Sequence, residues 1–372
     1  MNIFGQDLSQ RELRQRVGDV AAVGGLREFV LDNGTERGVR AIELRSVAGL
    51  EVDVLVDRAL DLGNARFKGV PFSWRSGNGF RNPGLHEHND EQGLSWLRAI
   101  DGLLVSGGLD HTLSGAEVDA KNYVYPPKQT VTHSLHGRLT AIPGRLLEAR
   151  EIWQDDSAIL RVRGEVIQSA VFGEHLRLTR TVEIDLDGTE IRLHDVVDNL
   201  GFERTPHMFL YHFNFGWPLV DEGTEFVAPI SRQLWASDSV REQQISYRLT
   251  PEPQPGAVEQ VIEHELVSGA DGMHRVALIT ADGTRGVELS WDSSTLPNFV
   301  EWQNLREGQY AIGLEPSTHH VTGENQARAD GSMIWLEHGE SREYRSTIRV
   351  LDGISETLAA RERIRAIASQ PD

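Results

Sequence analysis

The chain has 372 residues, of which 39% are hydrophobic and 25% charged, which is typical of a globular protein with a packed core and excludes a disordered or fibrous one. Its 37 Lys and Arg against 56 Asp and Glu give a net charge of −19, which disfavours nucleic acid and anionic membrane surfaces as partners. The lack of cysteine excludes disulfides, thiolate metal sites and cysteine nucleophiles.

The N-terminal residues 1–20 are expected to form an extension with a short helix over Ser9–Val17. The first sixteen residues are polar and of mixed charge, and they lack the basic start and apolar run of a secretory signal. No apolar run in the sequence approaches the length that a membrane span needs. These features predict a cytoplasmic protein.

Most of the chain is expected to form short strands, because apolar and polar residues alternate over runs that are separated by Gly, Pro, Asn or Asp. The clearest unit is an antiparallel hairpin in which Leu176–Asp185 and Glu190–Val197 flank a turn at Asp187-Gly188. The other expected strands are Gly38–Leu44, Leu50–Val56, Ala158–Val166, His274–Ile279, Gly286–Trp291 and Tyr344–Val350.

A second helix is expected near the C-terminus, over Ser355–Ser369 with Ser355 as its cap, within a C-terminal helix and tail at 354–372. No linker or low-complexity segment divides the chain, and no internal repeat is evident. We therefore predict a single all-β domain over residues 1–372, built as a large antiparallel β-sandwich.

One long polar segment, Gly77–Glu91, has no strand pattern. Long polar loops in compact domains tend to be functional or mobile. This loop is equally well interpreted as the cover of a site and as a solvated excursion on the surface.

Histidine titrates near neutral pH, so histidines in apolar, strand-like segments are candidates for proton transfer. His111, His136 and His212 are such residues. Glu315 stands in a Gly-Leu-Glu-Pro segment, where apolar neighbours are expected to perturb the pKa of its carboxyl group. Taken singly, each of these residues is better explained as a hydrogen-bonded or ion-paired core residue.

In combination, three motifs in this order resemble the aldose 1-epimerase (galactose mutarotase-like) superfamily. They are Leu135-His136-Gly137, His212-Phe213-Asn214-Phe215 and Leu314-Glu315-Pro316. Upstream, Val56–Gly63 and Gly69-Val70-Pro71 are similar to the early hairpin of that family, and together with Gly107-Gly108-Leu109 they look closest to a bacterial branch, the DUF4432 group. The resemblance extends over roughly residues 20 to 350.

This resemblance implies the mutarotase-like supersandwich fold and an isomerase that opens and closes a sugar ring. Carried over by motif, it implies that His212 is the general acid, that Glu315 is the general base, and that His136 binds the ring or its oxygen. The other residues predicted to bind substrate are Arg58, His111, Glu301, Trp302 and Gln303, of which His111 has no obvious counterpart in the classical enzymes of the family. Arg58 and Trp302 are also explained by a structural salt bridge and by core packing.

The implied reaction needs a carboxylate to deprotonate the anomeric hydroxyl and an imidazolium to protonate the ring oxygen, with neither a metal nor an organic cofactor. The expected partner is a small-molecule sugar, and an exposed sheet edge or terminal helix could support a homodimer. The galactose enzymes carry an Asp-His-Asn-Phe segment that holds sugar hydroxyls, and none occurs between Asn214 and Glu301. The identity of the sugar is therefore left open.

Two alternatives remain open. His111, His136, His212 and Glu315 could instead form a three-nitrogen, one-oxygen site for a divalent metal, which would indicate a metal-dependent sugar isomerase. A protein with the same fold could also bind carbohydrate without turning it over. Nucleophilic hydrolysis is disfavoured because the sequence has no Gly-x-Ser-x-Gly motif.

Overall fold

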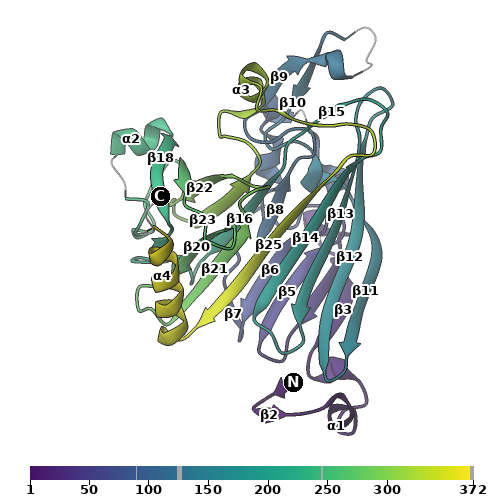
Figure 1. Cartoon of the computed structure of the whole chain (residues 1–372), viewed down its shortest axis with the longest axis vertical. Helices are drawn as coiled ribbons and strands as arrows, with labels where there is room; N and C mark the ends of the chain where they lie inside the picture. Colours follow the sequence, from purple (N-terminus) through teal and green to yellow (C-terminus); the bar gives the residue numbers. More distant parts are fainter. Residues whose placement is uncertain (89, 124–127, 244–245, 369–372) are drawn as a thin grey trace.

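Long antiparallel strands dominate the computed structural model of the chain, which describes residues 1–88, 90–123, 128–243 and 246–368 (Figure 1). Strand β13 (His175–Asp185) buries every second side chain, as its alternating sequence requires. Strand β14 (Glu190–Asn199) pairs with it in antiparallel register, with Leu178 opposite Val197 and Val182 opposite Leu193. The hairpin that the sequence predicts around Asp187-Gly188 is therefore present.

Eight strands form the largest sheet, in which β13 and β14 lie between β12 and β25. In order across the sheet, the strands are β11 (Arg145–Gln154), β12 (Ser157–Ser169), β13, β14, β25 (Ser341–Asp352), β21 (Arg285–Asp292), β20 (Met273–Ile279) and β17 (Glu225–Val227). Each of the eight predicted strands corresponds to a strand of this sheet or of the five-stranded sheet described next, with ends that differ by at most three residues.

Two smaller sheets make up the opposite layer. One has the order β18 (Ile230–Ala236), β19 (Gln260–Leu266), β22 (Asn298–Asn304), β23 (Ala311–Ser317), β16 (Leu210–Gly216) and β8 (Leu104–Gly107). The other has the order β3 (Gly25–Val30), β4 (Arg40–Arg45), β5 (Leu50–Leu55), β6 (Asp61–Phe67) and β7 (Val70–Pro71). Backbone hydrogen bonds from Trp74 to Asn214 and from Gly216 to Phe72 join the two sheets.

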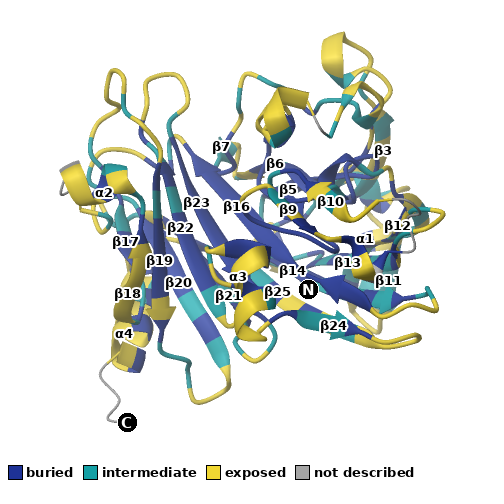
Figure 2. Ribbon diagram, turned by 90° about the horizontal axis from the view of Figure 1, so that it is seen from above, coloured by how far each residue is buried: buried dark blue, intermediate teal, exposed yellow. Residues whose placement is uncertain are grey.

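The hydrophobic core lies between these layers. A single cluster of buried side chains draws on all three large sheets, with Leu178 from β13, Val54 from β5 and Phe213 from β16 among its members. Figure 2 shows the buried strands as continuous dark ribbons through the middle of the molecule. Sheet-on-sheet burial of this kind is the main stabilising contribution in a β-sandwich.

Short elements surround the sandwich. They comprise three two-stranded ribbons, β1 (Asn2–Ile3) with β2 (Gln6–Asp7), β9 (Ala116–Asp119) with β10 (Thr130–His133), and β15 (Thr205–His207) with β24 (Ile334–Leu336), and four α-helices, α1 (Gln10–Arg14), α2 (Asp238–Gln243), α3 (Gly323–Asp330) and α4 (Ile354–Ala368). Seven 3-10 turns are also described, namely η1 (Val20–Ala22), η2 (Gly34–Glu36), η3 (Pro83–Leu85), η4 (Asp90–Gly93), η5 (Ser95–Arg98), η6 (Ala120–Asn122) and η7 (Leu139–Ala141).

The two terminal helices lie where the sequence predicts them, but Ser355 is not the cap of the second one, because α4 already begins at Ile354 and Ser355 lies inside it. Ser9 caps α1 in a reciprocal capping box with Glu12. Helix α4 packs Ile364 against the outer face of β20, and residues 369–372 of the predicted C-terminal helix and tail lie outside the described residues. The all-β sandwich class predicted from the sequence is thus confirmed.

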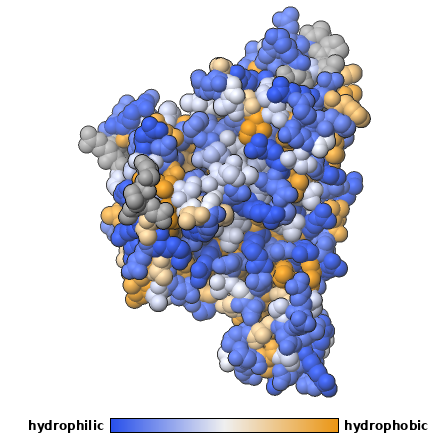
Figure 3. All heavy atoms as spheres, viewed as in Figure 1, coloured by the Kyte–Doolittle hydropathy of each residue, from blue (hydrophilic) through white to orange (hydrophobic). Residues whose placement is uncertain are grey.

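One face of the molecule is largely polar. Figure 3 shows that hydrophilic residues cover most of the face seen in Figure 1. Among the described residues, no helix combines the length and the apolar character that a membrane crossing requires.

Candidate active site

Two neighbouring strands bring a histidine and a glutamate to the outer face of the six-stranded sheet. In β16, Tyr211 and Phe213 point into the main core, so the alternation of the strand turns His212 to the opposite face. In β23, Leu314 belongs to the same core, and Glu315 therefore shares the outer face with His212. The two strands pair in antiparallel register through Phe213 and Leu314.

A third group, His136, comes from the turn that follows β10. His136 has a left-handed φ of 53°, and Gly137 next to it has a φ of 75°. A Cβ atom on Gly137 would lie 2.4 Å from the carbonyl oxygen of His111, so this position admits only glycine. The His-Gly motif is therefore explained by the local backbone. The glycine allows the turn to approach the neighbouring backbone, and this turn places His136 beside β16.

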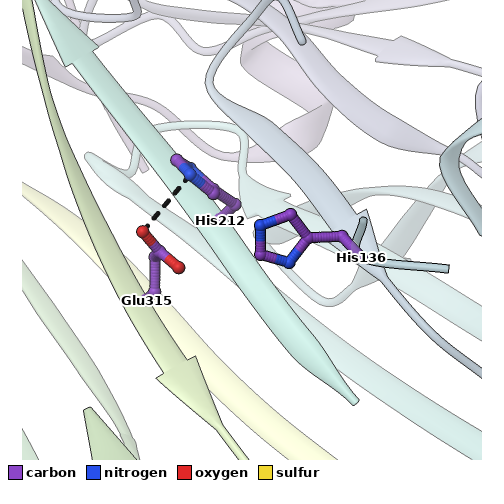
Figure 4. Close-up of side chains that lie close together, drawn as sticks. All are labelled: His136, His212 and Glu315. Carbon is purple, nitrogen blue, oxygen red and sulfur yellow. Dashed lines mark ion pairs between the residues drawn. The ribbon is translucent and has the colours of Figure 1, made fainter. Parts of the chain in front are cut away.

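These three side chains converge. The Nε2 atom of His212 lies 3.2 Å from Oε1 of Glu315, and the rings of His136 and His212 meet edge to face with centroids 5.8 Å apart. Figure 4 shows His212 and Glu315 on adjacent strands and the ring of His136 directed toward them from its loop. One potential ligand atom from each of the three residues lies within 4.8 Å of the others, so the cluster has the dimensions of a metal site as well as of an acid–base pair.

Indole rings enclose the cluster. The ring of Trp96 in η5 lies 4.5 Å from that of His136 and 5.3 Å from that of His212, and the ring of Trp302 lies 5.4 Å from that of His212. Trp74 packs against Trp302 at 5.8 Å. These tryptophans belong to a small apolar cluster of their own, which leaves only 8% of His136, 2% of His212 and 3% of Glu315 exposed.

Burial sets the protonation of the site. It raises the pKa of the Glu315 carboxyl well above its usual value, and the charge of Glu259 acts in the same direction. Burial also lowers the pKa of His212 to about 3 and holds the pKa of His136 well below its usual value, with the charge of His212 adding to the latter effect. The apolar surroundings therefore favour the uncharged forms of all three groups.

Of the other residues predicted to bind substrate, Trp302 alone contacts the cluster. Glu301 and Gln303 alternate with it along β22, and they face the core on the other side of the sheet. There the carboxylate of Glu301 accepts hydrogen bonds from Nε2 of His264 at 2.9 Å and from Nε2 of Gln303 at 2.6 Å. The structure does not bring Glu301 or Gln303 to the cluster, because the two-residue period of a strand separates them from Trp302.

Arg58 and His111 are also engaged elsewhere. The guanidinium group of Arg58 donates hydrogen bonds to the carbonyl oxygens of Thr140 at 2.9 Å and of Ala99 at 2.6 Å. Arg58 therefore holds the segment that follows Trp96 in place. His111 uses both ring nitrogens, with Nδ1 2.7 Å from Glu324 and Nε2 3.0 Å from the carbonyl oxygen of Ser114. Neither side chain is free to contact a ligand at the cluster in this arrangement.

Two residues at the site are absent from the sequence prediction. Trp96 lies beyond the polar loop Gly77–Glu91, of which Asn89 is outside the described residues, and nothing in its local sequence distinguishes it from a core tryptophan. Glu259, the residue before β19, accepts a hydrogen bond from Nε1 of Trp302 at 3.1 Å, and its charge helps to raise the pKa of Glu315. Its place in an exposed, polar segment gives no local signal that could have identified it.

The polar loop itself packs beside the site. The backbone N–H of Leu135 donates to the carbonyl oxygen of Gly93, and the hydroxyl groups of Ser95 and Ser134 both donate to the carbonyl oxygen of His88. The loop thereby links the Trp96 turn to the segment that carries His136.

Comparison with known proteins identifies the family. The model of the domain of unknown function DUF4432 matches residues 36–350. No curated protein matches the sequence.

Solved structures share the fold over nearly the whole chain. A protein of Klebsiella pneumoniae, provisionally named an aldose 1-epimerase, is 23% identical and has a TM-score of 0.84, with 98% of this chain and 92% of that chain covered. A galactose mutarotase-like protein of Clostridium acetobutylicum is 12% identical with a TM-score of 0.62, covering 89% and 99% of the two chains. A protein of Escherichia coli K12, also provisionally named an aldose 1-epimerase, is 14% identical with a TM-score of 0.53, covering 88% and 99%. The chain belongs to the DUF4432 family and has a galactose mutarotase-like fold.

Proposed function

We propose that the protein is a carbohydrate isomerase of the aldose 1-epimerase type, which interconverts the anomers of a free sugar or sugar derivative. The observation that carries this proposal is the buried pair of Glu315 and His212, whose facing atoms are 3.2 Å apart, with His136 beside it. The fold shared with mutarotase-like proteins supports the same class of reaction.

The pair matches the proton requirement of anomer interconversion. Ring opening removes a proton from the anomeric hydroxyl and adds one to the ring oxygen, so the number of protons on the protein does not change. An anionic Glu315 and a protonated His212 become a protonated Glu315 and a neutral His212 as the ring opens. Ring closure on the other face of the aldehyde reverses the transfer and restores the pair.

The buried environment is compatible with the proposed transfer of one proton between the bound sugar and the pair of Glu315 and His212. Burial favours a protonated Glu315 with a neutral His212, which is the state that the open-chain sugar would meet. The hydroxyl groups of the bound sugar would stabilise the ionic state by hydrogen bonding to both side chains. Each positioned acid or base contributes about 10²–10⁴-fold in rate.

His136 and the tryptophans would position the sugar. The Nδ1 atom of His136 accepts the backbone N–H of Leu113 at 3.3 Å, so a neutral His136 carries its proton on Nε2 and can donate it to a sugar oxygen. The indole rings of Trp96 and Trp302 offer apolar faces to the C–H groups of the ring. Because Trp96 encloses His136 and His212, we expect its turn to move when a sugar enters.

Polarimetry on a panel of pure sugar anomers tests the proposal. Glu315→Gln keeps the size of the side chain, His212→Asn replaces the imidazole by a smaller amide, and both remove proton transfer, so each variant should interconvert anomers about 10²–10⁴-fold more slowly than the parent protein. Folding of both variants is checked by circular dichroism. Variants that fold and retain the parent rate would exclude these catalytic roles, and a parent protein that binds sugar without accelerating the reaction would indicate a carbohydrate-binding protein.

A metal-dependent isomerase is the second candidate, because the geometry of the cluster also fits a cation. His136, His212 and Glu315 offer two nitrogens and one oxygen within 4.8 Å, which is a ligand set that zinc uses in catalytic sites. His111 does not complete this set, since Glu324 and Ser114 occupy its nitrogens. Stoichiometric metal in the purified protein that is lost in His136→Ala would favour this candidate over the cofactor-free reaction.

A further inference from the structure

A second pocket lies next to the segment that carries His136. It has a volume of about 410 Å³ and opens between β10, the end of β12 and the turn that follows it. Part of its lining is apolar and consists of Val131, Ile142 and Ile167. No residue of the lining belongs to the cluster of His136, His212 and Glu315. Its volume falls within the range of about 300–1,000 Å³ that is usual for small-molecule sites.

An imidazole with one unpaired nitrogen lines this pocket, since Nε2 of His133 lies 3.5 Å from the hydroxyl of Tyr123 while its Nδ1 atom has no partner among the described residues. His133 is only 2% exposed, and its Nδ1 atom makes no hydrogen bond to any residue that the structure describes. The nearest carboxylate oxygen, on Asp110, is 4.0 Å away. The ring is held in place by stacking on His111, with centroids 4.8 Å apart and planes 8° from parallel. Leaving a buried polar atom unpaired is unfavourable, so a ligand that bonds to Nδ1 would be favoured at this point.

Two carboxyl groups, of Asp110 and Glu174, also line the pocket and are held by one amide side chain. Gln168 donates from Nε2 to Asp110 at 2.7 Å and to Glu174 at 3.1 Å, while its Oε1 accepts the backbone N–H of Leu109 at 2.9 Å. The nitrogen and the oxygen of the Gln168 amide are therefore both used, which fixes the two carboxyl groups relative to one another. Although burial opposes it, the neighbouring His133 and the bond from Gln168 lower the pKa of Asp110, whereas burial and the charge of Asp110 raise that of Glu174.

Arg138 contributes the opposite charge. It lines the pocket half-buried, and its guanidinium group forms no ion pair or hydrogen bond within the described ranges. The pocket thus presents a cation, an anionic carboxylate and neutral groups that both donate and accept, next to aliphatic side chains. An anionic ligand would meet Asp110, and a cationic ligand would meet Arg138, so an uncharged molecule with many hydroxyl groups fits this mixture best.

We propose that this pocket is a second ligand site, which binds an uncharged polyhydroxylated molecule of monosaccharide size. Nδ1 of His133 and the guanidinium group of Arg138 form hydrogen bonds to its hydroxyl oxygens. The carboxyl groups of Asp110 and Glu174 accept hydrogen bonds from its hydroxyl groups. Val131, Ile142 and Ile167 contact its C–H groups. The site does not depend on any reaction at Glu315, so it stands whether or not the proposed isomerase activity is found.

Calorimetric titration with methyl α-D-glucopyranoside, myo-inositol and D-glucitol tests this site, because none of the three can undergo anomer interconversion. Ala170 lines the pocket, whereas its neighbour Val171 is 92% exposed. Ala170→Trp should therefore fill the pocket and weaken binding by about tenfold or more, while Val171→Trp places the same ring in solvent and should bind like the parent. Arg138→Met keeps the aliphatic stem, loses no ion pair within the described residues, and should also weaken binding.

The controls separate the two sites. Glu315→Gln should bind these probes as the parent does. Binding that is lost in Glu315→Gln and kept in Ala170→Trp would assign the probes to the first cluster and overturn the proposal. The proposal would also be overturned if none of the three probes bound. It would be overturned as well if only D-glucuronate and inorganic phosphate bound and Ala170→Trp weakened that binding.

Discussion

At neutral pH, burial favours a protonated Glu315 and a neutral His212, and this preference links the proposed chemistry to the stability of the fold. A carboxyl group whose folded pKa is raised binds its proton more tightly in the folded state than in the unfolded chain. Above the unfolded pKa, a rise in pH therefore lowers the free energy of unfolding until the folded group also ionises. His212 has the opposite linkage, since its lowered pKa makes the unfolded chain bind protons first, and stability rises with pH between about 3 and its usual value near 6.5.

The Glu315→Gln variant should isolate the carboxyl contribution. Glutamine does not titrate, so the melting temperature of the variant relative to the parent should rise as pH increases from about 5 to about 8. Thermal melts at several pH values measure this difference. Glu307→Gln, at an exposed carboxyl group, should show no such trend, and a difference that stays constant with pH in Glu315→Gln would contradict the raised pKa.

At the scale of the element, the strand β23 supports the site through Gly313, which has no side chain, as well as through Glu315. Gly313 lies beside His212 on the same face of the sheet. A Cβ atom at Gly313 would lie 2.8 Å from Cε1 of His212 and 3.1 Å from the ring of Trp302. The absence of a side chain at this position therefore allows the imidazole of His212 to lie close to β23, with its Nε2 atom 3.2 Å from Glu315.

Gly313→Ala should displace His212 without preventing strand formation. The alanine methyl group would push the imidazole away from Glu315, and a misplacement of about 1 Å can cost about 10²-fold in rate. Polarimetry under saturating sugar measures the loss. Gly77→Ala, where a Cβ atom would meet nothing within 4 Å, serves as the control and should retain the parent rate. A Gly313→Ala protein as active as the parent would show that the position of the imidazole is not critical.

At the scale of the whole molecule, a buried ion network ties the two layers of the sandwich together. Arg180 of β13 is fully buried and donates to Asp195 of β14 at 2.7 Å and to Asp61 of β6, in the opposite layer, at 2.6 Å. Ser106 of β8 bonds to Arg180 and Asp61, and the hydroxyl of Tyr211 donates to Asp195 at 2.7 Å. Since Tyr211 precedes His212 in β16, the network also anchors the strand that carries the proposed acid.

Arg180→Met should be strongly destabilising, because it leaves two carboxylates buried without their cation. Removal of one partner from a buried ion pair typically costs about 3–5 kcal/mol. Arg177 provides a matched control, since it lies on the same strand and pairs with Asp198 at 2.8 Å, with 37% of its side chain exposed. Arg177→Met should cost less than about 1 kcal/mol. Urea denaturation measures both values, and equal losses would mean that the buried network contributes no more than a surface pair.

Much of the fold was predictable from local pattern. The two-residue alternation in Leu176–Asp185 and Glu190–Val197 predicted strands and a hairpin that the structure contains, because sandwich burial acts on every second residue. The DUF4432 resemblance is confirmed by the family match. The roles assigned to His136, His212 and Glu315 stay predictions, as do the single domain, the homodimer and the cytoplasmic location.

The residues around the cluster were less predictable. Glu301 and Gln303 were assigned to the pocket with Trp302, yet neighbours in a strand point to opposite faces, and sequence similarity alone does not say which face meets the ligand. Trp96 reaches the site from a turn whose course no local pattern specifies.

The sequence by itself determined the strands, their alternation, the capped helix α1, the position of the helix α4 and the glycine that the His136 turn requires, because each of these depends on residues close together in the chain. Only the tertiary structure decided that β16 and β23 are neighbours, that Arg58 and His111 are occupied by other partners, and that the Trp96 turn encloses His212. Those facts depend on the order of strands in the sheet and on loop packing, which arise from contacts between residues far apart in the sequence.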